Sequence, residues 1–178
     1  YGMEKRFGIW RKVGAEWKPE SVTINQKGPD IVVVTARGPL PSVSASYALV
    51  YRVFPTGDIL VEASYIPAKG GGKVSEMPRF GMQVAIKPGF ENLRWYGRGP
   101  HETYSDRCDA RMDIYEGTVT AQYFDYTEPG ETGNKVDVRW VTLTNEKGVG
   151  LLAIGQPALS VNALHYTTED LMSVSHGW

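Results

Sequence analysis

The sequence predicts an all-β protein from its composition, its hydrophobic pattern and its turn signals. Val occurs 18 times against 10 Leu, and 8 Ile and 12 Thr add to the excess of β-branched residues, which favours pleated sheets over helices. Apolar and polar residues alternate along several segments, as in half-buried strands. Turn residues separate these segments at short, even intervals. Together these features predict a large antiparallel β-sandwich of roughly ten strands in a single domain over residues 1–178.

The start of the chain gives contradictory signals. Trp10, Val13 and Trp17 are spaced as on one face of a helix, whereas Gly8 and Gly14 oppose a regular helix. The first twenty residues are therefore left without a predicted element.

Beyond this stretch the period of the pattern becomes two. Strands are predicted at 22–24 and 31–35, the second one buried, on either side of a turn at 28–30. The clearest local prediction is a β-hairpin over 44–66, because alternation in both arms flanks a Pro-Thr-Gly-Asp turn at 55–58.

The second half of the chain continues this pattern apart from two segments. Residues 101–117 are polar and are predicted to be irregular. Residues 167–171 resemble a short helix with a Thr cap and acidic residues in its first turn. The remaining strands are predicted at 80–86, 93–97, 119–126, 136–144, 151–154 and 160–164.

Charge and cysteine content exclude several classes of protein. The chain has 19 basic and 20 acidic residues, a net charge of −1, so no overall field attracts nucleic acid or an anionic membrane. The longest apolar run, 31–34, is far too short to span a bilayer. The single cysteine, Cys108, permits neither an intrachain disulfide nor a multi-thiolate zinc site. The compartment stays open between cytoplasm and periplasm.

Candidate catalytic residues are present without a decisive pattern. His101 and Glu102 could form a general acid–base pair, but neighbours in sequence rarely face each other, so structural hydrogen bonding is the expected role. Glycoside hydrolysis needs two carboxylates around the sugar. The sequence does not show which two carboxylates would act together. The candidates are Glu102, Asp106, Glu128, Glu131 and Asp137. Trp95 and Trp140 lie in strand patterns and are expected in the core.

Residues 95–107 give a far more specific indication of function than these single candidates. From Trp95 to Arg107 the chain reads WYGRGPHETYSDR. This resembles the W-x-G-x-G-P-x-E-x-Y-x-D-R signature of the C-terminal domain of family 2 glycoside hydrolase β-galactosidases. The similarity spans almost the whole chain, including 122–140 and 166–176, and is strongest from 78 to 144. The chain departs from the family's usual Asn at Thr103 and from its usual loop sequence at 129–134.

The matching residues are expected to form an architectural loop that is also a candidate wall of a sugar pocket. They are Trp95, Gly97, Arg98, Gly99, Pro100, His101, Glu102, Tyr104, Asp106 and Arg107. Gly97 or Gly99 is expected to have a positive φ at a sharp strand exit. Asp106 or Arg107 is expected to bond the backbone or each other.

The resemblance implies a β-supersandwich like that of galactose mutarotase, incomplete at both ends of this chain. It implies that the catalytic acid and nucleophile lie on a separate (β/α)₈ barrel, and that the family's pocket tryptophan lies beyond residue 178. On this interpretation the chain is a non-catalytic segment of a β-galactosidase acting on terminal β-D-galactosides. It would shape the sugar pocket, support subunit packing and be inactive alone.

The same resemblance implies which partners and cofactors to expect. Its partners would be the other domains of the parent, especially the barrel, the galactoside, and further copies in a homo-oligomer. No catalytic residue and no metal are expected in this segment, because the family's Mg and Na are bound elsewhere.

Two other functions stay open on the residues alone. A free-standing aldose mutarotase would need His101 or His165 as the acid and Glu102 as the base. A carbohydrate-binding module would expose aromatic side chains in a row, for which Trp95, Trp140 and Tyr123 are the candidates.

Overall fold

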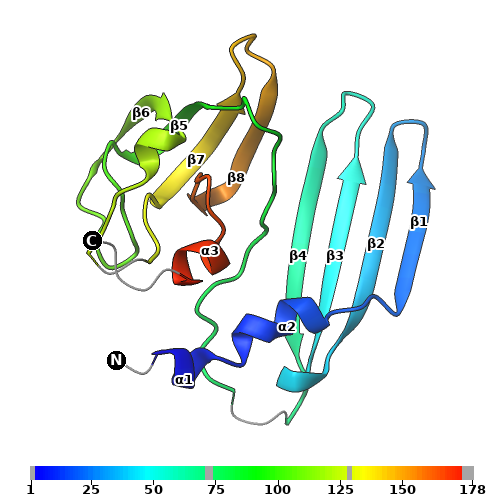
Figure 1. Cartoon of the computed structure of the whole chain (residues 1–178). Helices are drawn as coiled ribbons and strands as arrows, with labels where there is room; N and C mark the ends of the chain where they lie inside the picture. Colours follow the sequence, from blue (N-terminus) through cyan, green and yellow to red (C-terminus); the bar gives the residue numbers. More distant parts are fainter. Residues whose placement is uncertain (1–2, 71–73, 128–129, 174–178) are drawn as a thin grey trace. The chain divides into compact units, whose positions relative to one another are not determined.

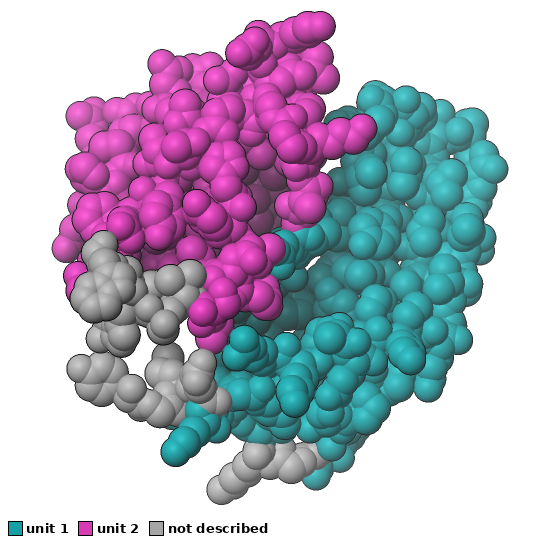
Figure 2. All heavy atoms as spheres, viewed as in Figure 1, with its two compact units in different colours: residues 1–83 teal, residues 84–178 magenta. Residues whose placement is uncertain are grey.

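The computed structural model describes residues 3–70, 74–127 and 130–173. The chain divides into two compact units, residues 1–83 and 84–178, shown in teal and magenta in Figure 2. Each unit contains one four-stranded antiparallel sheet (Figure 1). The predicted all-β class is confirmed, and two antiparallel sheets are what a sandwich domain contains. That the chain is a single domain stays a prediction.

Unit 1 is built on a sheet whose strands follow one another in chain order, β1-β2-β3-β4. The strands are β1 (Ser21–Lys27), β2 (Ile31–Leu40), β3 (Ala45–Val53) and β4 (Ile59–Pro67). The predicted hairpin is confirmed, since Val53 is paired with Ile59 across the turn. Gly57 in that turn has a φ of +91°, a conformation that glycine adopts without a steric penalty. Residues 31–35, predicted to be buried, are only half-buried.

Two short helices precede this sheet, and the second of them packs against one end of it. α1 (Met3–Phe7) and α2 (Trp10–Glu16) precede β1, and a 3₁₀ turn, η1 (Pro41–Val43), follows β2. Val13 of α2 is buried with Leu40 and Val43, and the Trp10 ring meets Tyr65 edge to face at 5.8 Å. The helical spacing at the start of the chain therefore outweighs its glycines. Burying this apolar face stabilises the helix by more than the glycine in its middle costs.

Unit 2 contains the second sheet, in the order β6-β5-β7-β8. Its strands are β5 (Asn92–Gly99), β6 (Arg111–Thr118), β7 (Lys135–Thr144) and β8 (Gly150–Val161). A 3₁₀ turn, η2 (Thr120–Gln122), follows β6, and α3 (Thr168–Ser173) follows β8. Thr167 and Asp170 cap α3 reciprocally: the Asp170 amide donates to Thr167 Oγ1 at 3.1 Å and the Thr167 amide to Asp170 Oδ2 at 2.8 Å. This helix and its Thr cap are confirmed.

Four predictions for the second half, three of strands and one of an irregular segment, are wrong in part or in full. Residues 111–117, predicted to be irregular, belong to β6, and 119–126 contain η2 rather than a strand. The two strands predicted at 151–154 and 160–164 are one strand, β8, whose pairing with β7 shifts register. Alternation reports which side chains face solvent, but a strand also needs a neighbour for its backbone bonds, and the sequence does not reveal that neighbour.

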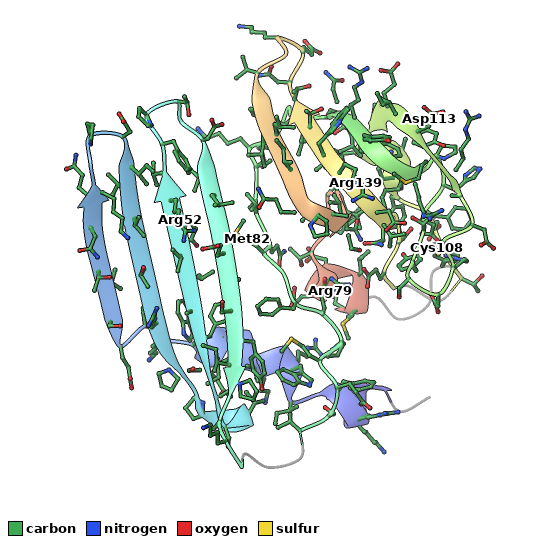
Figure 3. The ribbon with its side chains drawn as sticks, turned by 180° about the vertical axis from the view of Figure 1, so that it is seen from behind. Arg52, Arg79, Met82, Cys108, Asp113 and Arg139 are labelled. Atoms are coloured by element: carbon green, nitrogen blue, oxygen red, sulfur yellow. The ribbon has the colours of Figure 1, made fainter. Side chains whose placement is uncertain are left out.

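The segment 80–86 is the clearest example of this limit. It alternates as a strand does, yet it has no ladder partner among the described residues. Phe80, Met82 and Val84 are 51%, 66% and 56% exposed, and Met82 is labelled in Figure 3. The predicted half-buried strand is therefore wrong.

No helix within the described ranges has the length and apolar character needed to cross a bilayer.

Two glycines of unit 1 are expected to respond oppositely to alanine. A Cβ at Gly38 in β2 would lie 2.2 Å from the Lys18 carbonyl oxygen, whereas a Cβ at Gly14 in α2 would meet no atom within 4 Å. Gly38→Ala should lower the free energy of unfolding by about 2 kcal/mol or more. Gly14→Ala should raise it by up to about 1 kcal/mol through helix propensity. Urea unfolding followed by circular dichroism measures both, and equal signs would contradict this packing.

Candidate functional site

The signature stretch begins in the hydrophobic core of unit 2. Trp95 on β5 is 2% exposed, and its indole N–H donates to the Arg98 carbonyl at 3.1 Å. Leu93 and Val138 are buried against it, and the Tyr115 ring of β6 packs at 5.4 Å. The core role expected for Trp95 is thereby confirmed.

Gly97 and Gly99 are required for space rather than for backbone conformation. Neither has a positive φ, because both lie within β5, so the expected left-handed turn is wrong. A Cβ at Gly97 would lie 2.8 Å from Val138 Cγ2, and one at Gly99 would lie 2.8 Å from Tyr115 Cδ2. The two glycines let neighbouring strands place large side chains over β5. The peptide bond from Gly99 to Pro100 is cis.

Glu102, which follows the strand, carries the densest hydrogen bonding in the signature. Its side chain is 13% exposed. Five groups donate to its two carboxylate oxygens: Arg107 Nη2 at 2.6 Å, the Gly133 amide at 2.8 Å, Thr132 Oγ1 at 3.3 Å, Tyr104 Oη at 3.4 Å and Tyr126 Oη at short range. We call these six residues the Glu102 cluster. It joins the signature loop to two later segments of the chain.

The Glu102 cluster holds its carboxylate in the charged form. Burial alone would raise the pKa of Glu102, but hydrogen bonds from Tyr126, the Gly133 amide and Arg107 outweigh burial and lower it. Burial and the charge of Glu102 raise the pKa of Tyr104 to about 12. A general acid needs the opposite shift, toward a raised carboxyl pKa. The arrangement therefore favours a structural anion over a proton donor.

The loop around this cluster is closed mainly by backbone bonds. The Tyr104 and Arg107 backbones exchange two hydrogen bonds of 3.1 and 2.9 Å. The Arg107 side chain pairs with Glu102, not with Asp106 as considered from the sequence. Thr103, the departure from the family pattern, is 2% exposed, and its Oγ1 accepts from the Val136 amide at 3.0 Å.

Arg98 extends outward from the strand that carries Trp95. Its Nε donates to Asp137 Oδ2 at 2.5 Å and its Nη1 to the Ala110 carbonyl at 2.9 Å. Asp137, one of the candidate carboxylates, is therefore engaged in an ion pair. Glu128 lies outside the described residues.

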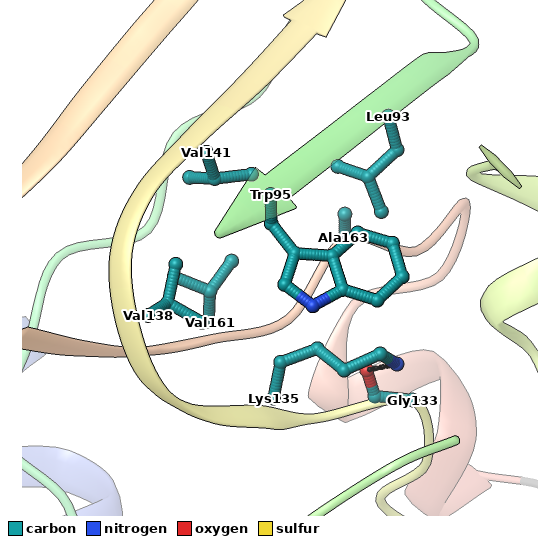
Figure 4. A pocket seen from close by; sticks show the side chains of 8 residues that line it. All are labelled: Leu93, Trp95, Gly133, Lys135, Val138, Val141, Val161 and Ala163. Atoms are coloured by element: carbon teal, nitrogen blue, oxygen red, sulfur yellow. Dashed lines mark hydrogen bonds between the residues drawn. The ribbon is translucent and has the colours of Figure 1, made fainter. Parts of the chain in front are cut away.

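A buried lysine that sequence reasoning missed lies beside this cluster. Lys135 is 4% exposed, its ammonium donates to the Gly133 carbonyl at 2.9 Å, and it lies 5.2 Å from the centre of the Trp95 ring (Figure 4). Burial lowers the pKa of Lys135 to about 8, and the charge of Glu102 only partly offsets this. Its place at the start of a predicted strand was the only signal, and lysine is rarely buried.

Gly133 forms hydrogen bonds with both Glu102 and Lys135. Its amide donates to Glu102 and its carbonyl accepts from Lys135. Its φ is +75°, and a Cβ there would lie 2.4 Å from the Gln122 carbonyl oxygen, so only glycine fits. The adjoining cavity, lined by Leu93, Val141 and Val161 among others, has about 10 Å³, the room of one water molecule. It cannot hold a sugar.

The alternative functions find little support in this geometry. His101 is exposed, His165 Nε2 lies 3.2 Å from Glu91 Oε2, and neither histidine is among the groups that bond Glu102. The mutarotase pair is therefore not assembled. Of the three aromatic side chains proposed for a carbohydrate-binding module, Trp95 is buried, Trp140 is half-buried and Tyr123 is 38% exposed, so they do not form an exposed row. No group of three or more metal-ligating side chains occurs in the part of the chain that the structure describes.

The close approach at Gly97 predicts a measurable coupling. Gly97→Ala should lower the free energy of unfolding by about 1–3 kcal/mol, because the added methyl meets Val138. Val138→Ala should recover part of that cost, so that the double variant is more stable than the sum of the single effects predicts. Strictly additive effects in urea unfolding would contradict the steric explanation.

The buried Lys135 predicts a dependence of stability on pH. Its folded pKa of about 8 lies below the value near 10.4 of an unfolded lysine. The unfolded chain therefore binds more protons between about pH 8 and 10.5, and stability rises with pH across that window. The free energy of unfolding of wild type relative to Lys135→Met should rise there and be constant below it.

The exposed Lys147 provides the matched control for this measurement. Its side chain is in solvent in both states, so the difference between wild type and Lys147→Met should stay constant with pH. A constant difference for Lys135→Met as well would contradict the burial of that ammonium.

Comparisons with known proteins place this chain in a family. The family described as β-galactosidase small chain matches residues 3–178. The chain is 35% identical over 175 residues to a protein named β-galactosidase from Priestia megaterium, covering 98% of this chain and 16% of the relative. Over 95% of this chain, it is 28% identical to a β-galactosidase of Halalkalibacterium halodurans and 29% to one of Lactobacillus delbrueckii subsp. bulgaricus.

These relatives are much longer proteins. The chain spans 16–17% of the length of these three relatives. The signature loop, the Glu102 cluster and Lys135 all lie within the matched residues. On these grounds the chain belongs to the β-galactosidase small-chain family.

Proposed function

We propose that this chain is a non-catalytic segment of a larger β-galactosidase that hydrolyses terminal β-D-galactosides. In that enzyme it would form part of the wall of the sugar pocket and support the packing of subunits. Its partners would be the other domains of the parent, above all the catalytic barrel, and further copies of the parent in a homo-oligomer.

The names and lengths of the relatives support this assignment to a larger enzyme. The three relatives described above are β-galactosidases in which the matched segment occupies about one sixth of the chain. Most of each relative therefore lies outside the matched part and has room for a separate catalytic domain.

The engagement of Glu102 is the observation that carries the non-catalytic role. Retaining hydrolysis requires a protonated carboxylic acid and a nucleophilic carboxylate about 5–5.5 Å apart at the anomeric carbon. Glu102 is the acid of the signature that is most enclosed, yet five donors occupy its oxygens and its pKa is lowered. Protonating it would remove the charge that strengthens those bonds. A carboxylate used in this way supports a loop and does not exchange protons with a substrate.

The exposed side chains of the loop are the part available to a sugar or a neighbouring domain. The Arg107 side chain is 61% exposed although its guanidinium reaches Glu102, and His101 of the same loop is exposed as well. The Glu102 cluster would hold this rim in place, while the Mg and Na of the parent would be bound by other domains.

The isolated 178-residue chain is expected to have no hydrolytic activity. The test incubates the purified, folded chain with a chromogenic β-galactoside and uses the Priestia megaterium enzyme as the positive control. The expected result is release of chromophore at the uncatalysed rate, because the proposal assigns the acid and the nucleophile to another domain.

A Glu102→Gln variant makes this test decisive. Turnover by the wild-type chain that disappears in the variant would place a catalytic carboxylate in this segment and overturn the proposal. Circular dichroism of the variant shows whether a loss arises from unfolding instead.

A further inference from the structure

Among the described residues, Lys135 carries a buried charge that contacts no carboxylate. Its side chain is enclosed, and its Nζ donates to the Gly133 carbonyl at 2.9 Å. An ammonium has three N–H groups to satisfy. The adjoining cavity of about 10 Å³ has room for one water molecule, so the charge is not hydrated as it is in bulk water. A charge held in this way costs free energy that the neutral amine does not.

The one anion whose field reaches this ammonium is already occupied. Both oxygens of Glu102 accept hydrogen bonds from the Glu102 cluster, which includes the Arg107 guanidinium as a cation of its own. Glu102 therefore compensates Lys135 only across a distance. The other side chains that line the cavity are uncharged, namely Leu93, Trp95, Val138, Val141, Val161 and Ala163.

The strands that pack against Lys135 bring no further counter-charge. β8 contains no charged residue. The charged residues of β5 and β7 have partners elsewhere: Arg98 pairs with Asp137, Arg94 lies over the Trp140 ring, and Arg139 donates to the Pro157 carbonyl. In the arrangement that the structure shows, Lys135 is thus a surplus cation in the core of unit 2.

The end of β7 that carries Lys135 is loosely joined to its sheet. β5 pairs with β7 only from Trp140 to Thr144, and the pairing of β7 with β8 shifts register on both sides of Val138. Residues 132–136 are held instead by bonds to the signature loop, such as that from the Thr103 amide to the Asn134 carbonyl at 2.7 Å. A segment attached in this way can open locally while the ladder beyond it stays formed.

We infer that Lys135 makes the attachment of residues 132–136 to the signature loop proton-dependent. The closed arrangement favours the neutral amine, and proton uptake favours a locally open arrangement in which the ammonium reaches water. The four-carbon stem of lysine is long enough to bring the charge to the surface once the Gly133 amide leaves Glu102. This conformational device goes beyond the proposed function and does not depend on contact with a sugar.

Proton linkage gives the direction of the effect. In the closed arrangement, burial lowers the pKa of Lys135 to about 8, whereas exposure in the open arrangement returns it toward the ordinary value near 10.4. The open arrangement therefore binds more protons between about pH 8 and 10.5, and closing becomes more favourable as pH rises through that window. Opening is most frequent below it, where the buried amine is charged.

Amide hydrogen exchange measures this opening in the purified chain. The probes are the Gly133 and Thr103 amides, which are hydrogen-bonded in the closed arrangement. After correction for the intrinsic exchange rate, their protection should rise by about tenfold or more between pH 7 and 9.5 in the wild-type chain. It should stay constant in Lys135→Met, whose side chain binds no proton. Circular dichroism checks the fold of the variant, and the wild-type profile decides alone if the variant does not fold.

Two controls separate this opening from other routes of exchange. The Asn145 amide in the β7–β8 turn donates to the Val149 carbonyl at 2.9 Å, and its protection should not change with pH. Urea below the unfolding transition should leave exchange of both probes nearly unchanged, because a local opening exposes little surface. A flat wild-type profile, an equal rise in Lys135→Met, or exchange that accelerates with urea as in global unfolding would each overturn the inference. None of these outcomes depends on hydrolytic activity, so the proposed function is tested separately.

Discussion

The carboxylate of Glu102 is the constraint on which the rest of the signature region depends. A charge removed from water must be matched by hydrogen-bond donors, because an unpaired buried charge costs more than a domain's net stability. The donors come from the loop after β5, from Tyr126 and from residues 132–133. Satisfying one carboxylate therefore positions three stretches of chain that are far apart in sequence.

Gly133 transmits this requirement to the hydrophobic core. Its amide donates to Glu102, and its carbonyl accepts a hydrogen bond from the ammonium of Lys135. That ammonium lies over the Trp95 ring, so a cation is placed against the core. The small residues at 97 and 99 then allow Val138 and Tyr115 to close over that ring. The Glu102 cluster, the buried Lys135 and the packing around Trp95 are therefore linked by direct contacts.

This use of an acid for structure supports the proposal that the segment assists an enzyme whose catalytic residues lie on other domains. Catalytic carboxyls keep a proton or a free lone pair available to the substrate. In the Glu102 cluster both oxygens are already occupied by donors of the chain itself.

The sequence by itself determined the all-β class, the 44–66 hairpin, the capped helix after residue 166 and the family resemblance, because each rests on local periodicity, turn chemistry or a contiguous motif. Only the tertiary structure decided that Gly97 serves close packing, that Lys135 is buried, and that 80–86 pairs with no strand in the described ranges. Those outcomes depend on which parts of the chain, distant in sequence, lie next to each of these residues. The sequence pattern indicates whether a residue prefers to be buried, but it does not identify the residues that will pack against it.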